Sequence, residues 1–196
     1  DILQHLMDHS IFINREENKW MKEVIEVVRR TSLYFQPQIR TKSINEGWAS
    51  LCHERMFMAD PRMSSYETDF ARTNSRVVAY PRIGFNPYIT YKNLLEFIEG
   101  LAEKGKLSRE YQLLKDVEAR KDFANQTETG AGKSILFEAR KSFDDFTLAN
   151  FLSVDDFQDF VNKYNLFVVG QRLNPEKFTI EYYIKSRNGE EYRKML

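Results

Sequence analysis

Glycine and proline are scarce in this chain, and their scarcity limits what it can fold into. Eight glycines and five prolines stand among 196 residues, about half the share that a globular chain usually carries. An all-β fold needs these residues at its many tight turns, whereas helix interiors exclude them. Because 42% of the residues are hydrophobic, the chain can fill a sizeable core. We therefore expect one folded body or two small ones, dominated by helices.

The charge balance disfavours two classes of partner. The chain holds 29 Lys+Arg and 29 Asp+Glu, whereas binding to a phosphate backbone or to anionic lipid requires a gathered surplus of basic residues. No apolar run approaches the roughly 18 to 20 residues of a membrane span, and the single cysteine, Cys52, cannot form an intramolecular disulfide. We expect a cytoplasmic protein that binds neither nucleic acid nor membrane. Both ends fall within sequence patterns, so we also expect a piece of a longer protein.

Apolar residues at helical spacing predict most of the secondary structure. Residues 16–33 carry a broad apolar stripe, including Trp20, Val24 and Val28, that is typical of an interior helix, and Pro37 is expected to end this segment. Asn86-Pro87 predicts a helix start, with a capping side chain followed by a proline at the first helical position, and the helix should reach about residue 104. Further helices are expected at about 43–58, 107–123, 134–140, 143–152 and 153–164.

The remaining segments are expected to be connectors and one short sheet. Residues 59–83 should form a connector with a short helical stretch at 66–71, and 124–133 a polar break. In 178–185 the period changes to two, which predicts a strand that pairs antiparallel with 166–169 and buries Phe178, Ile180 and Tyr182 against the helices. The predicted fold class is α+β, predominantly α-helical with a short antiparallel sheet near the C-terminus. We expect a helical body over 1–164 and a small β element over 165–196.

Three partial motifs fail on inspection. Residues 129–134 look like the end of a phosphate-binding loop, but Thr127 stands where that motif needs glycine and no buried strand precedes it. His53-Glu54 begins a zinc-protease motif whose second histidine is replaced by Phe57. His5 and His9 are one helical turn apart, without a third ligand nearby in the sequence, which favours a solvated helix. We expect no cofactor and no stoichiometric zinc in this chain by itself.

The segment 43–58 carries the candidate site. On a helical wheel Trp48 and Leu51 lie in a core stripe, whereas Glu46 and His53 share the opposite face, two turns apart. Gly47 allows another element to approach the helix closely. The two polar residues suit the wall of a cleft as well as a solvated surface. Because their Cα atoms are roughly 10.5 Å apart along the helix axis, only long side chains or a bridging ion, water or third residue could join them.

Several blocks resemble the stage V sporulation protein R (SpoVR) family in the same order along the chain. The most specific is Asn45-Glu46-Gly47-Trp48-Ala49 with His53 downstream, preceded by Tyr34-Phe35-Gln36-Pro37-Gln38 and Thr41-Lys42. Further matches are Asn86-Pro87-Tyr88, Ile135 to Arg140, Asp144 to Leu152, and Leu166-Phe167. Two departures are Thr90, which stands where the family usually has glycine, and the missing upstream half, in which the family carries a pair of histidines.

This resemblance implies a bacterial protein with a role in spore cortex formation, or a related process in bacteria that do not sporulate. Two interpretations of its activity stay open. In the first, the protein is a non-enzymatic assembly protein with protein partners, and Glu46 and His53 belong to a polar network with Thr41, Lys42 and Asn45. In the second, it is a zincin-like metallohydrolase in which Glu46 binds zinc together with the missing histidines, and His53 ligates or orients a ligand. Asn86, Tyr88 and Trp48 would support the site. Substrate and oligomeric state are not readable from the sequence.

Overall fold

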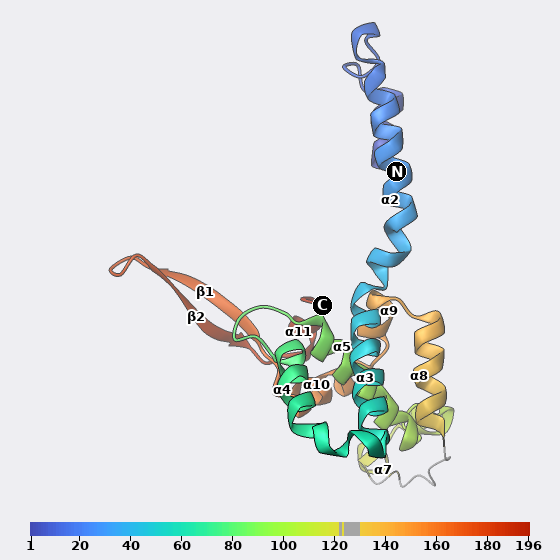
Figure 1. The fold of residues 1–196 in the computed structure, drawn as a ribbon, viewed down its shortest axis with the longest axis vertical. Helices are drawn as coiled ribbons and strands as arrows, with labels where there is room; N and C mark the ends of the chain where they lie inside the picture. The colour runs from blue at the N-terminus through green and yellow to red at the C-terminus, as the bar shows by residue number, and fades with distance from the viewer. Residues whose placement is uncertain (122, 124–129) are drawn as a thin grey trace. The chain divides into compact units, whose positions relative to one another are not determined.

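The computed structural model describes residues 1–121, 123 and 130–196. The chain divides into two compact units, one over Asp1–Lys42 and the other over Ser43–Leu196. Helices dominate, with a two-stranded antiparallel sheet near the C-terminus, which confirms the predicted fold class (Figure 1). None of the helices in the described ranges is long and apolar enough to cross a membrane.

The first unit is a pair of helices, α1 (Ile2–His9) and α2 (Trp20–Arg40), with a short 3₁₀ helix at Glu16–Asn18 between them. Met7 and Ile13 are its buried apolar side chains. The prediction of an interior helix at 16–33 is wrong in this structure, because α2 has no buried residue and Trp20 and Val27 are 60% and 64% exposed. The stripe is present, but nothing within this unit covers most of it.

Pro37 does not end the first long helix, contrary to the prediction. The ring of a proline removes one backbone N–H donor but leaves the carbonyl free to accept. Here Thr41 uses that carbonyl twice, through its backbone N–H at 3.1 Å and its hydroxyl at 2.9 Å. The helix therefore continues past the proline by nearly one turn and ends at Arg40.

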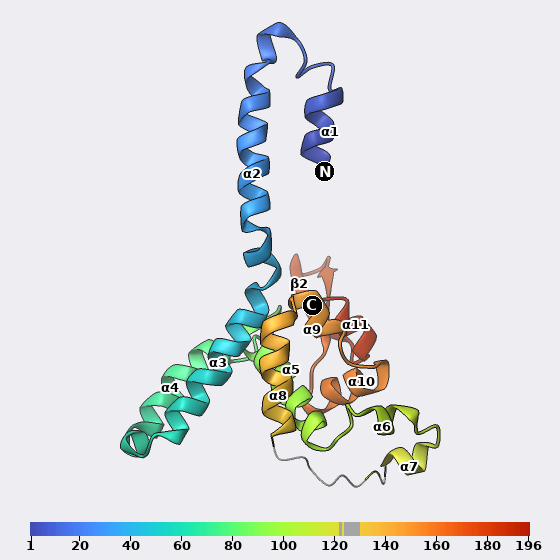
Figure 2. The same cartoon turned by 90° about the vertical axis from the view of Figure 1, so that its right-hand side faces the viewer.

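The second unit is built around α5 (Pro87–Glu103). As predicted, this helix starts at Asn86-Pro87, where the Asn86 side chain accepts a hydrogen bond from the Tyr88 N–H at 2.9 Å. Helix α8 (Ala131–Ser142) lies alongside α5 (Figure 2). The core contains buried side chains from α5, from α8 and from other segments of this unit, among them Ile44, Leu51, Leu94, Leu95, Ile98, Leu136, Leu148, Phe157 and Phe160.

The other helices of this unit agree with the predictions in part. Helix α3 (Lys42–Ala59) matches the predicted 43–58, whereas the expected connector at 59–83 is largely helical, with a 3₁₀ helix at Pro61–Tyr66 and α4 at Glu67–Val78. The predicted helix at 107–123 is two short helices, α6 (Arg109–Leu113) and α7 (Val117–Lys121). The polar break predicted at 124–133 falls mostly outside the described residues. The remaining helices are α9 (Asp145–Asn150), α10 (Val154–Lys163) and α11 (Gly189–Arg193).

Helix α10 shows how local signals set its ends. The Ser153 hydroxyl accepts from the Asp156 N–H at 3.2 Å, which is the predicted N-terminal cap. At the other end Asn165 takes a left-handed backbone conformation, with φ 51°, and the Leu166 N–H returns to the Val161 carbonyl at 2.9 Å. This is the usual way in which a helix closes its last turn.

Strands β1 (Val168–Asn174) and β2 (Thr179–Ser186) form an antiparallel ribbon. Its pairs Leu173 with Ile180 and Val169 with Ile184 place apolar residues on one face, and Arg172 pairs with Glu181 on the other. The predicted alternation is thus confirmed, but the predicted burial is wrong. Phe178, Ile180 and Tyr182 are 89%, 55% and 49% exposed, because no helix within the described residues covers that face. Phe178 also lies in the turn, with φ 49°, rather than in the strand.

Candidate functional site

The family-like block, Asn45 to Ala49 with His53, lies in α3. Helix α3 is anchored at its first turn by a carboxylate from another helix. The Asp145 side chain of α9 accepts from the Ser43 N–H at 2.9 Å and from the Ile44 N–H at 2.7 Å. The Asp145 carbonyl accepts from the Tyr91 hydroxyl at 3.2 Å. A carboxylate suits the positive end of a helix dipole and satisfies two backbone donors that would lack partners. Asp145 therefore fixes where α3 begins relative to α5.

Gly47 is the point at which α3 crosses α5. A Cβ atom there would lie 2.5 Å from Cβ of Tyr91, 2.6 Å from its carbonyl carbon and 2.7 Å from N of Lys92. No side chain fits in that space, since two of these atoms are backbone. The close approach expected from Gly47 is thus present, and the element that approaches is α5.

Glu46 lies next to this crossing and is half-buried. Its carboxylate is hydrogen-bonded to the Tyr88 hydroxyl, and this bond, followed by the charge of Glu46, raises the pKa of Tyr88 above its usual range. Tyr88, which the resemblance assigns to the support of the site, is therefore a direct partner of Glu46. The pair joins the second residue of the family-like block to the first turn of α5.

His53 points to another neighbour. Its side chain is exposed, and its ring meets that of Phe70 on α4 edge to face, with centroids 5.3 Å apart. Phe70 also stacks on Phe57, one turn further along α3, at 4.0 Å. Figures 1 and 2 show α3 and α4 side by side. Glu46 thus contacts α5 and His53 contacts α4, and a concavity shared by the two stays a prediction.

A buried lysine between two carboxylates is the feature that sequence reasoning missed. Lys92 of α5 is 7% exposed, and its Nζ lies 3.1 Å from Glu54 of α3 and 3.2 Å from Glu96 of α5. The Asn74 amide of α4 reaches the same Glu54 carboxylate at 3.5 Å. A lysine four residues before a glutamate in the same helix, here Lys92 and Glu96, is a signal that could have pointed to it. The cluster ties three helices together.

The remaining predicted residues have mainly structural surroundings. Trp48 packs against the core and meets Phe137 edge to face, with centroids 5.5 Å apart. Asn45 is half-buried and Lys42 is exposed. Thr41 belongs to the first unit, where its hydroxyl donates to the Pro37 carbonyl. Asn86 holds the start of α5 and donates from its amide to the Val77 and Ala79 carbonyls at 2.8 and 2.9 Å.

The three partial motifs have ordinary roles where the structure describes them. Glu54, the second residue of the zinc-protease-like pair, binds Lys92. The rings of His5 and His9 stack at 4.3 Å, and His9 Nδ1 lies 3.0 Å from the His5 carbonyl oxygen. Gly132 of the phosphate-loop-like segment faces the side chains of two glutamates on α5, which would repel a phosphate, and Thr127 lies outside the described residues. Over the described ranges no three His, Cys, Asp or Glu side chains are grouped so that they could hold a metal ion.

Comparison with known proteins identifies the family. The chain matches the family described as SpoVR like protein over residues 1–196. It is also 30% identical over 79 residues to the uncharacterized protein YcgB of Escherichia coli (strain K12), an alignment that covers 35% of this chain and 16% of that relative. The matched part is thus a small fraction of the relative's length. No solved structure matches the chain. The chain belongs to the SpoVR family.

Proposed function

We propose that this chain is part of a cytoplasmic bacterial protein that acts by binding other proteins, in sporulation and spore cortex formation or in a related stress process. Family membership supports the biological setting. Support for the mode of action comes from the second unit, where the side chains of the family-like block serve the packing of helices and an apolar surface is exposed elsewhere.

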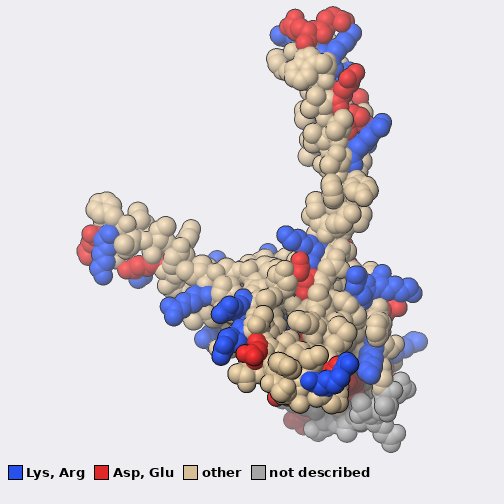
Figure 3. Space-filling model, viewed as in Figure 1, with Lys and Arg blue, Asp and Glu red and all other residues tan. Residues whose placement is uncertain are grey.

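The observation that carries the proposal is the uncovered apolar face of the β1–β2 ribbon. Leu173, Ile180 and Ile184 lie on this face and are 67%, 55% and 50% exposed. In the view of Figure 3 the charged side chains of the ribbon gather along one side of it. Exposed apolar side chains that cluster, as opposed to single ones, are typical of surfaces that bind another protein. A two-stranded ribbon is also marginally stable unless something packs on it.

The polar side chains of α3 support the same interpretation. Glu46 is engaged by Tyr88 and Glu54 by Lys92, so both carboxylates satisfy groups inside the fold. Polar networks of this kind specify one arrangement of helices. Such a rigid helical unit is a suitable base for an exposed binding ribbon.

The alternative, a zincin-like metallohydrolase, needs zinc held by Glu46 with histidines from chain outside this sequence. Within the described residues Glu46 is hydrogen-bonded to Tyr88 and His53 contacts Phe70, so the two residues contact different helices. A catalytic zinc site requires three protein ligands around one point.

The experiment uses the full-length protein in a spore-forming host that lacks its own copy. Ile180→Glu places a charge on the apolar face and should reduce the yield of heat-resistant spores at unchanged melting temperature. Thr179→Glu, one residue away on the polar face, is the matched control and should leave the yield intact.

A second arm separates the two interpretations. Glu46→Gln should leave the metal content of the purified full-length protein unchanged. Two results together would favour the metallohydrolase and overturn the proposal. They are a normal yield of heat-resistant spores with the Ile180→Glu variant and a stoichiometric zinc ion that Glu46→Gln removes.

A further inference from the structure

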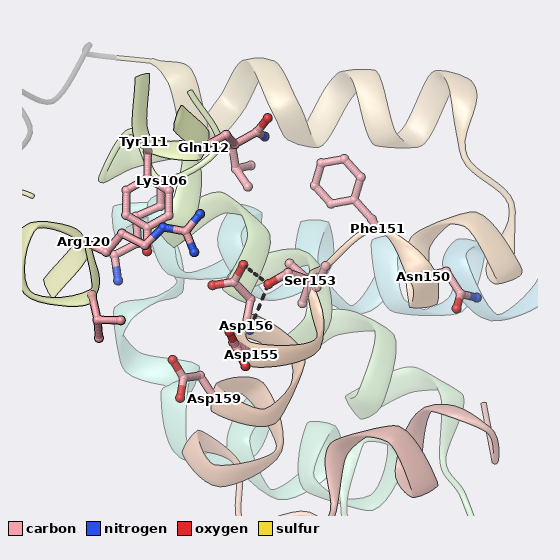
Figure 4. Close-up of a pocket in the computed structure, with 13 residues that line it drawn as sticks. Lys106, Tyr111, Gln112, Arg120, Asn150, Phe151, Ser153, Asp155, Asp156 and Asp159 are labelled. Atoms are coloured by element: carbon pink, nitrogen blue, oxygen red, sulfur yellow. Dashed lines mark hydrogen bonds between the residues drawn. The ribbon is translucent and has the colours of Figure 1, made fainter. Parts of the chain in front are cut away.

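A cleft on the second unit has walls of opposite charge. It encloses about 720 Å³ between the segment that carries α6 and α7 and the start of α10 (Figure 4). This volume lies within the range of pockets that hold small molecules. None of the residues discussed above as the candidate site lines it, so its chemistry is independent of the proposed function.

The basic wall consists of two cations held against one aromatic ring. Lys106 Nζ lies 6.0 Å and the Arg120 guanidinium carbon 5.3 Å from the centre of the Tyr111 ring. Figure 4 shows the Arg120 guanidinium directed towards the start of α10. Its Nε is buried and has no hydrogen-bond partner in the described part of the chain. A buried donor without a partner is costly, and a bound anion would satisfy it.

The acidic wall is the first turn and a half of α10. Asp155 and Asp159 are one turn apart and line the cleft together with Asp156. Asp156 accepts from the Ser153 hydroxyl at 2.6 Å. Across residues 1–121, 123 and 130–196, the structure shows no ion pair that joins any of these aspartates to Lys106 or Arg120. The two walls therefore face each other unpaired across the cleft.

We propose that this cleft binds a small molecule with one carboxylate and two ammonium groups, such as L-lysine. Three aspartates against two cations leave the site with one excess negative charge, which a ligand with one excess positive charge neutralises. The carboxylate faces Arg120 and Lys106, and the ammonium groups face Asp155 and Asp159. Tyr111 and Phe151, which also line the cleft, pack against the aliphatic chain between the charges.

Calorimetric titration of the full-length protein with three matched probes tests this proposal. L-lysine carries all three charges, norleucine lacks the side-chain ammonium, and 1,5-diaminopentane lacks the carboxylate. We expect L-lysine to bind at least about tenfold more tightly than either analogue, because each loses a charge-assisted contact.

Variants that remove one charge from each wall show which group of the ligand that wall binds. Arg120→Gln should lower the affinity for L-lysine to that for 1,5-diaminopentane and leave the affinity for the diamine unchanged. Asp159→Asn should lower the affinity for L-lysine to that for norleucine. Arg109→Gln and Glu118→Gln change exposed charges outside the cleft and should have no effect. Equal binding of the three probes, absence of saturable binding, or equal loss in the control variants would overturn the proposal. Melting temperatures of all variants show whether they are folded.

Discussion

The crossing of α3 and α5 and the β1–β2 ribbon use the same kinds of residue in opposite ways. At the crossing, Gly47 touches the backbone of α5, and the lysine Lys92 is buried between two carboxylates. On the ribbon, Gly170 faces the ring of Tyr183, and Arg172 pairs with Glu181 at the surface, at 2.9 Å. Glycine, an ion pair and apolar side chains occur in both regions, but only at the crossing are they surrounded by other elements.

The difference shows that burial, not residue type, decides what a contact contributes to stability. A buried ion pair leaves uncompensated charge when one partner is removed, whereas an exposed pair is replaced by water. The crossing is therefore expected to be sensitive to substitution. Substitutions in the ribbon should change the free energy of unfolding little, and their effect should appear in binding.

The largest contrast is expected between the two glycines. An added Cβ meets an atom at 2.5 Å in both cases, but at Gly47 its neighbours include backbone, and at Gly170 the neighbour is the end of an exposed tyrosine ring that can swing away. Gly47→Ala should cost about 3 kcal/mol or more despite the better helix propensity of alanine. Gly170→Ala should cost less than about 1 kcal/mol.

Urea unfolding of the two glycine variants measures this contrast. If Gly47→Ala were as stable as Gly170→Ala, α3 and α5 would not cross as closely as the structure has them.

The next contrast is between two leucines. Leu51 of α3 is 1% exposed and Leu173 of β1 is 67% exposed. Leu51→Ala should lower the free energy of unfolding by about 3 kcal/mol, because it leaves a cavity in the core. Leu173→Ala should change it by about 0.5 kcal/mol or less. A large effect of Leu173→Ala on the isolated chain would mean that the ribbon is covered by this chain itself.

A smaller difference in lost stability is expected between substitutions of two cations, Lys92 at the crossing and Arg172 on the ribbon. Lys92→Met leaves Glu54 and Glu96 facing each other without the ammonium group between them, and we expect a loss of about 2 kcal/mol. Arg172→Met, at a side chain that is 71% exposed, should cost about 0.5 kcal/mol or less. Thermal unfolding of the two variants at equal ionic strength makes the comparison. Equal losses would place Lys92 in solvent.

Signals within a few residues allowed correct predictions from the sequence. The caps at Asn86 and Ser153 act on N–H groups two or three positions away, and the alternation in β2 follows from the two-residue period of a strand. The resemblance to the SpoVR family also rested on short blocks and is confirmed. The helix predicted at 43–58 has apolar residues at helical spacing, and Ile44 and Leu51 of this stripe are buried.

The features that were missed depend on residues far apart in the sequence. Asp145 reaches the start of α3 from 102 residues further along the chain, and Lys92 meets Glu54 only because two helices cross. Apolar periodicity shows which face of an element is hydrophobic, but it does not show what covers that face. The same limit explains both wrong burial predictions, on α2 and on β2.

The smallest expected effect concerns alkaline pH and also separates the core from the ribbon. Burial, followed by the charge of Glu96, raises the pKa of Tyr164 to about 12, from about 10 in an unfolded chain. The folded state then holds this proton more tightly than the unfolded state. The contribution of Tyr164 to the free energy of unfolding is therefore complete below pH 10 and is lost as the pH rises towards 12. Since Tyr164 is only half-buried, solvent screening limits the effect to about 1 kcal/mol at pH 11.

Urea unfolding at pH 9 and pH 11 measures this loss, which should be smaller in Tyr164→Phe, because phenylalanine has no proton to lose. Tyr183→Phe on the exposed ribbon is the matched control and should lose as much stability as the unmodified chain. An equal alkaline loss in Tyr164→Phe and Tyr183→Phe would assign the effect to other buried tyrosines of the core, such as Tyr91, whose pKa burial also raises.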